Sequence, residues 1–272
     1  MSGLPPHTAV PFSNERQQIV DFLKIGKSKH TAYGIVELDI TGVRDQLRRH
    51  GRTHGQPLSL TSYLIYCFVQ AVAADKKMQA YRHGKKLIYF DDVDVATMVE
   101  RHIEGERTPV SYILRAAQNK SIYEISHEIK EAKLHDSTAL IDSEEMINKK
   151  WLYDTIRRTG FLRRWFLRRM AQNPFLKKKI NGTIGFSSMG MFSSDNAGWI
   201  VPITPHTLTA MVGGIRHIPS LRNGVLVDRE WISITIAMDH DILDGAPTAR
   251  FIERYRKLLI GGLPEPAEVV ST

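Results

Sequence analysis

The chain has 272 residues, and 42% of them are hydrophobic, so it can bury a large core and is neither an intrinsically disordered protein nor a small disulfide-stapled one. Its one cysteine, Cys67, excludes an internal disulfide and a multi-cysteine zinc site, and we expect one cytoplasmic domain over residues 1–272. The net charge of +8 comes from residues 149–179, whose own net charge is +10, so it does not indicate a nucleic-acid-binding fold, and we expect no nucleic-acid partner.

Neither a signal peptide nor a membrane span is predicted. The first twelve residues lack a basic start followed by an apolar block. The longest apolar stretch, residues 58–74, is interrupted by polar side chains and is too short to cross a bilayer.

The first predicted elements are a strand and a short helix. Residues 35–40 alternate apolar with acidic side chains, which is the pattern of a half-buried strand. Val43 and Leu47 are four positions apart and predict a short helix that ends at Gly51.

A buried helix, two strands and an amphipathic helix are predicted next. Residues 61–74 are apolar nearly all round, so we expect a buried helix in which Cys67 fills the core and is not a nucleophile. Strands are predicted at 87–90 and 93–99, and the apolar spacing of residues 122–132 predicts an amphipathic helix.

The C-terminal third is predicted to be mostly strands followed by one helix. The clearest strand ends directly at Asp239-His240, and the last helix is opened by Pro247 and ended by Gly261-Gly262. Because no regular βαβ repeat is present, we expect an α+β fold, a two-layer sandwich with a mixed sheet. The predicted strands are residues 183–186, 199–203, 209–213, 225–228 and 231–238.

Several motifs of other enzyme classes are incomplete. The H-E-x-x-H pattern that begins at His127 has Glu131 in place of the second histidine, and His50 and His54 lie in a polar stretch across a glycine, so no metal is predicted. The glycines of residues 182–190 fit neither a hydrolase elbow nor a phosphate-binding loop.

The remaining candidate is the segment of residues 239–245, with the sequence DHDILDG. His240 follows a buried strand and precedes a helix, so its backbone is rigidly held, as a general base requires. Asp244 supplies a carboxylate four residues later, and Gly245 is expected to serve the turn.

This segment resembles the D-H-x-x-x-D-G signature of dihydrolipoyl acyltransferases, the core components of 2-oxo acid dehydrogenase complexes, and the H-x-x-x-D-G of chloramphenicol acetyltransferase. Residues 10–16, 90–95 and 182–190 also resemble family segments and occur in the same order. The resemblance implies a homotrimeric, chloramphenicol acetyltransferase-like fold. It also implies direct acyl transfer with coenzyme A or acyl-CoA as substrate. We expect no bound metal, and, in contrast to the family's lipoyl-bearing members, no lipoyl group on this chain.

Carried over by position, the resemblance gives each site residue a role. His240 matches the general base, Ser187 the hydroxyl that stabilises the oxyanion, and Asp244 the carboxylate that fixes the histidine loop. Arg16 matches the ion-pair partner of Asp244, so we expect a buried Arg16–Asp244 pair. The family also implies that His240 and Ser187 face each other across a subunit boundary.

The chain departs from the family in three respects. Asp241 stands where the dehydrogenase members usually have a basic residue after the histidine. We expect no lipoyl domain, subunit-binding domain or linker before the catalytic core, so we expect a lipoyl domain or another acceptor to come from another chain. The basic segment, residues 149–179, is expected to be an amphipathic insertion.

The insertion is predicted to form a helix with an aromatic face. Three alternatives are open for it: packing on its own domain, docking of residues 151–179 on an anionic membrane surface or a partner, or binding of coenzyme A phosphates or an acidic substrate. The expected face comprises Phe161, Leu162, Trp165, Phe166 and Met170, with Arg163, Arg164 and Arg168 away from it.

The predicted function is coenzyme A-dependent acyl transfer to a thiol acceptor of the dihydrolipoyl type. Two alternatives are an acyltransferase that acts on a hydroxyl or amine of a small molecule and a non-catalytic trimeric scaffold. The acyl group, the acceptor and any assembly of trimers into a cage are left open.

Overall fold

The computed structural model describes residues 5–55, 57–103, 106–134, 155, 159–189 and 198–264. Within these ranges, no helix is both long enough and apolar enough to cross a membrane.

A six-stranded mixed sheet forms one layer, with the order β1-β8-β7-β6-β4-β5. The β4–β6 and β6–β7 pairs are parallel and the others are antiparallel, which confirms the predicted α+β class with a mixed sheet. A separate two-stranded sheet pairs β2 with β3. The strands are β1 (Thr31–Asp39), β2 (Tyr81–His83), β3 (Lys86–Ile88), β4 (Val95–Ile103), β5 (Glu106–Leu114), β6 (Ile184–Ser188), β7 (Leu208–Arg222) and β8 (Val225–Asp239).

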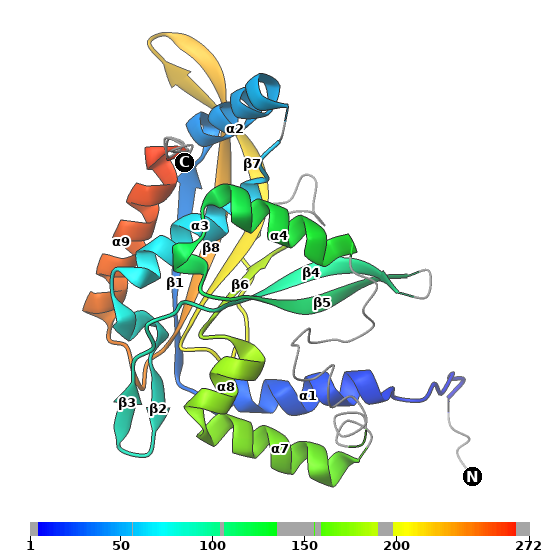
Figure 1. Ribbon diagram of the computed structural model, residues 1–272. Coiled ribbons are helices and arrows are strands. Elements are labelled where there is room, and N and C mark those ends of the chain that lie inside the picture. The colour runs from blue at the N-terminus through cyan, green and yellow to red at the C-terminus, as the bar shows by residue number, and fades with distance from the viewer. Residues whose placement is uncertain are drawn as a thin grey trace, which may run out of the picture.

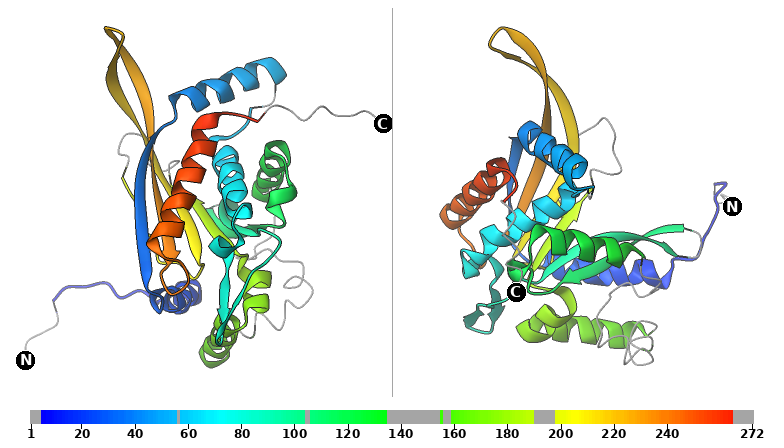
Figure 2. Two further views of the ribbon diagram at one scale, coloured as in Figure 1. Left: turned by 90° about the vertical axis from the view of Figure 1, so that its left-hand side faces the viewer. Right: turned by 45° about the horizontal axis from the view of Figure 1, so that its top comes forward.

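Helices cover one face of this sheet, and the other face lacks such a helical layer, as the left view of Figure 2 shows. The covering helices are α2 (Thr41–His54), α3 (Leu60–Ala73), α4 (Ile122–Leu134) and α9 (Gly245–Gly261). At the lower end of the sheet in Figure 1 lie α1 (Asn14–Lys27), α7 (Gly160–Gln172) and α8 (Pro174–Asn181). Two short 3-10 helices, η1 (Lys76–Gln79) and η2 (Ala117–Asn119), complete the described elements.

The longest strands, β7 and β8, form a hairpin that projects beyond the helices (Figure 1). Its turn residues, Asn223 and Gly224, have φ values of 51° and 78°. An Asn-Gly pair with two positive φ angles suits the right-handed twist of a two-residue hairpin. The strands predicted separately at 225–228 and 231–238 are therefore one strand, β8.

The structure corrects two further predictions and adds elements that were not predicted. Residues 199–203 lie outside the strands, although their composition predicts one. The helix α2 continues through Gly51 and ends before Gly55, whose φ of 67° suits a left-handed cap. The strand β5 and the helices α1 and α8 were not predicted.

The prediction that Cys67 fills the core is confirmed. Its side chain is buried in α3, and burial raises the pKa of the thiol to about 12. The thiol is therefore protonated at neutral pH and is a poor nucleophile.

The face of the sheet opposite the covering helices carries apolar side chains. Along β1, Val36 and Leu38 face the helices, whereas Tyr33 and Ile35 point the other way, and Ile35 is 53% exposed. Residues 198–203 cross part of this face, where the Tyr33 hydroxyl donates to the Pro202 carbonyl at 3.1 Å. We call this surface, with the exposed Trp199, Val201 and Ile203, the open face. Exposed apolar side chains gathered on one face are typical of a protein interface.

Candidate active site

The turn between β8 and α9 fixes the backbone of His240. The amides of Ile242 and Leu243 donate to the Asp239 carbonyl at 3.1 and 3.0 Å, and the His240 amide donates to the His30 carbonyl at 2.8 Å. Leu243 is buried and anchors the turn, while the His240 side chain is exposed. The structure therefore presents an imidazole on a rigid support, as predicted.

The acidic residue after the base has a partner. Asp241 Oδ1 lies 2.8 Å from His30 Nδ1, and both side chains are exposed. This hydrogen bond, with the charge of the carboxylate, raises the pKa of His30. The negative charge of Asp241 beside the base is thus balanced when His30 is protonated.

The prediction of a buried ion pair between Arg16 and Asp244 is wrong for the residues that the structure describes. Both residues are exposed, and no ion pair joins them. Arg16 lies in the first turn of α1, and a rise of 1.5 Å per residue places it roughly 17 Å from the helix end that leads to the His240 turn.

Asp244 and Gly245 instead form the start of α9. Asp244 is the N-cap residue, but its side chain makes no capping hydrogen bond. Gly245 is the first helical residue, and a Cβ built on it would have no neighbour within 4 Å. The turn conformation therefore does not require a glycine at this position.

Ser187 lies on β6 and points toward the open face. It pairs with Met211, which pairs with Thr235, which in turn pairs with Ile35. Paired residues of neighbouring strands point to the same side of a sheet. Because Ile35 is on the open face, the half-buried Ser187 hydroxyl is on that face as well.

Ser187 and His240 do not meet within one chain. Thr235, in the row of Ser187, is four residues from Asp239 along β8, and Ser187 is two strands away from β8. With spacings of about 3.4 Å per residue and about 4.8 Å between strands, Ser187 and Asp239, the residue before His240, are roughly 17 Å apart. A base and an oxyanion donor at that separation cannot act on the same carbonyl group.

A buried histidine, which no motif in the sequence marks, lies near the turn. His206 Nε2 is 2.7 Å from the Asn181 carbonyl, and Nδ1 is 3.1 Å from Thr204 Oγ1. Burial, with the charges of Lys177 and Lys29 nearby, lowers the pKa of His206 to about 3. Its ring is therefore neutral and structural at pH 7, and its burial separates it from any substrate.

The rings of His50 and His54, the two histidines four positions apart, stack on each other. The rings of His50 and His54 are 4.3 Å apart, and His50 Nε2 lies 3.1 Å from the Tyr123 hydroxyl. In the part of the chain that the structure describes, no three His, Cys, Asp or Glu side chains form a group that could hold a metal ion.

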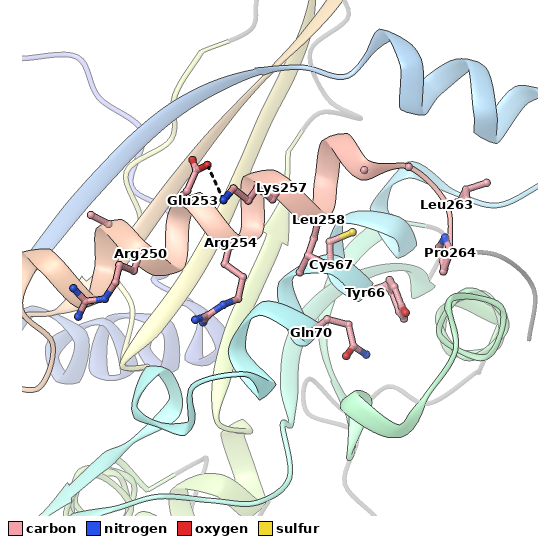
Figure 3. A pocket seen from close by; sticks show the side chains of 13 residues that line it. Tyr66, Cys67, Gln70, Arg250, Glu253, Arg254, Lys257, Leu258, Leu263 and Pro264 are labelled. Carbon is pink, nitrogen blue, oxygen red and sulfur yellow. Dashed lines mark ion pairs between the residues drawn. The ribbon is translucent and has the colours of Figure 1, made fainter.

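A groove of about 1080 Å³ lies between α3 and α9 (Figure 3). It is lined by Tyr66 and Gln70 of α3 and by Arg250, Arg254 and Lys257 of α9. The groove is on the helical side of the sheet, whereas Ser187 faces the open side, so it is not the place where Ser187 could act.

A family model described as "2-oxoacid dehydrogenases acyltransferase (catalytic domain)" matches residues 5–150 and 176–266. Among curated relatives, the lipoamide acyltransferase component of the branched-chain alpha-keto acid dehydrogenase complex of Bacillus subtilis is 18% identical over 92% of this chain and 51% of that protein. The dihydrolipoyllysine-residue acetyltransferase component of the pyruvate dehydrogenase complex of Zymomonas mobilis is 21% identical over 93% and 50%. The chain thus spans about half the length of these relatives.

Solved structures share the fold. A probable dihydrolipoamide acetyltransferase from Listeria monocytogenes has a TM-score of 0.67 at 18% identity, with 97% of this chain and 98% of that chain covered. A chloramphenicol acetyltransferase has a TM-score of 0.50 at 11% identity, with 91% and 98% covered. The expected chloramphenicol acetyltransferase-like fold is confirmed.

Proposed function

Because this chain belongs to the catalytic-domain family of the 2-oxoacid dehydrogenase acyltransferases, we propose that it transfers an acyl group between coenzyme A and a thiol acceptor of the dihydrolipoyl type. His240 takes the proton of the attacking thiol as the new sulfur–carbon bond forms at the thioester carbonyl. Ser187 donates a hydrogen bond to the oxygen that becomes negative. The tetrahedral intermediate then expels the second thiolate, which receives the proton from His240, so no acyl-enzyme forms.

The active unit that we propose is a homotrimer with each site between two chains. The observation that carries this proposal is the position of Ser187, on an open apolar face and roughly 17 Å from Asp239, the residue before His240 in its own chain. A second chain that covers the open face would bury Ile35 and Tyr33 and bring its own His240 to Ser187. Asp244, which is exposed in the single chain, would then lie close to the boundary between the two chains. We propose that Asp244 helps to fix the histidine loop there.

Two extensions follow from the relatives. One solved structure with a TM-score of 0.65 is the cubic core of a pyruvate dehydrogenase multienzyme complex. By analogy, we propose that trimers of this chain assemble further and that a lipoyl group carried by another chain is the acceptor.

The test of this function is release of free coenzyme A from a panel of acyl-CoA donors in the presence of dihydrolipoamide. We expect release that depends on dihydrolipoamide and that peaks at one donor length. Release that requires simple alcohols or amines instead would indicate an acyltransferase of small molecules. No release with any donor and acceptor would favour the trimeric scaffold and contradict the proposal.

We also propose that the segment containing α7 is an insertion that docks on an anionic membrane surface. The family match omits residues 151–175, which include α7. The helix packs on α1, where Arg163 Nε donates to the buried Asp21 Oδ2 at 2.9 Å. Burial would raise the pKa of Asp21, but its hydrogen bonds with Arg163 and Lys24 lower it.

The structure corrects the predicted faces of this helix. Arg163, expected on the solvent side, is buried, and Met170, expected on the aromatic face, is buried in the contact with the domain. Phe166 is half-buried. The outward side instead presents Phe161 and Trp165, which are 70% and 59% exposed. The residues exposed around them are Leu162, Arg164, Arg168 and Arg169.

Aromatic side chains flanked by arginines favour the interface of an anionic bilayer. Each engaged basic residue contributes about 1 kcal/mol to such binding. We expect the protein to sediment with phosphatidylserine vesicles at low salt, and high salt to weaken this. Arg164, Arg168 and Arg169 changed together to Gln should remove the binding, whereas the buried Arg163 must be left intact. Wild-type protein that stays in the supernatant with these vesicles would contradict the proposal.

A further inference from the structure

Asp239 organises the turn that carries the base. It is the last residue of β8, and its carboxylate is buried directly before His240. Oδ1 accepts a hydrogen bond from the Asp241 amide at 3.2 Å, while the carbonyl of the same residue accepts from the amides of Ile242 and Leu243. Three of the four residues after Asp239 are thus hydrogen-bonded to it.

Lys29 holds this carboxylate in place. Its ammonium group donates to Asp239 Oδ2 and also to the His206 carbonyl at 3.3 Å. The next residue, His30, accepts the hydrogen bond of the His240 amide. The link between α1 and β1 therefore hydrogen-bonds both to the Asp239 carboxylate and to the His240 backbone.

A buried lysine nearby, Lys177, forms no ion pair with this carboxylate. Lys177 Nζ donates to the Pro205 carbonyl at 2.6 Å and lies 3.7 Å from the centre of the Tyr81 ring. No ion pair joins it to a carboxylate of the described residues. Burial, with the charge of Lys29, lowers the pKa of Lys177 well below its ordinary value. Lys29 is therefore the cation that balances Asp239.

We propose that the Lys29–Asp239 ion pair positions His240 for catalysis, in place of the expected Arg16–Asp244 ion pair. Both residues are positioning residues, because they act on the turn that carries His240 and not on the reacting atoms. Loss of either partner leaves an unbalanced charge in a buried site and frees the turn. A displacement of the base by about 1 Å is enough to cost roughly 10²-fold in rate. This inference rests on the proposed acyl transfer for its kinetic test.

The kinetic test compares Lys29→Met, Asp239→Asn and the double variant with Lys27→Met. Lys27 is an exposed lysine two positions away and serves as the matched control. We expect each single variant at the pair to lower kcat roughly 10- to 100-fold while KM for acyl-CoA stays within about twofold. The double variant should lose no more than the worse single variant, because the two residues act through one interaction. The control should keep wild-type kcat.

Amide hydrogen exchange of residues 241–243 gives a readout that needs no activity. We expect faster exchange there in Lys29→Met and Asp239→Asn and wild-type exchange in Lys27→Met. Wild-type kcat and wild-type exchange in Lys29→Met would overturn the proposal, as would additive losses in the double variant. If the wild type transfers no acyl group, the proposed function fails, while the exchange data still decide whether the pair holds the turn.

Discussion

Replacement of His240 with alanine is expected to abolish acyl transfer and to leave the fold intact. The imidazole is the group to which the mechanism assigns proton transfer, and loss of a general base costs roughly 10²- to 10⁴-fold in rate. The side chain is exposed, and its backbone hydrogen bond to His30 does not depend on the side chain. We therefore expect the free energy of unfolding to change by less than about 0.5 kcal/mol.

The measurement is coenzyme A release by the purified variant, together with its thermal unfolding curve. His83→Ala is the matched control, because His83 is an exposed histidine on β2 outside the site. Ser187→Ala should keep weak activity, since loss of one oxyanion donor costs on the order of 10²-fold and the base is still present. Wild-type turnover in His240→Ala would show that another group moves the proton.

Local patterns predicted the elements that periodicity specifies. The alternation in β8 and the apolar spacing in α4 and α9 place these elements to within a few residues. The strand β5 was not predicted because Pro109 and Arg107 interrupt its alternating pattern. It is an edge strand, where proline is tolerated. The hairpin turn could have been found, because Asn223-Gly224 is a strong local signal.

Contacts between distant segments could not be predicted in this way. Lys29 and Asp239 are 210 positions apart, and Asp21 and Arg163 are 142 positions apart. No local pattern links such residues, so Arg163 was expected in solvent. The resemblance assigns roles to His240 and Ser187 by their positions in the motifs. The Arg16–Asp244 pair could not be predicted in the same way, because it depends on where α1 begins relative to the His240 turn, which no motif specifies.

The proposed site needs residues from two chains. Strand register places Ser187 in the row of Ile35 and Thr235, and this row is far from the end of β8 where His240 lies. In the proposed trimer, each chain contributes the base to one site and the hydroxyl to another. It follows that a chain without its base and a chain without its hydroxyl can complement each other.

Co-expression of His240→Ala and Ser187→Ala chains, each with its own affinity tag, tests this arrangement most directly. Hybrid trimers purified through both tags should contain one intact site in three, because a cyclic trimer with both variants has one boundary where a wild-type His240 meets a wild-type Ser187. We predict that such hybrids recover roughly one third of wild-type activity, although each parent variant alone is nearly inactive. Hybrids no more active than the Ser187→Ala and His240→Ala trimers from which they derive would contradict a site shared between chains.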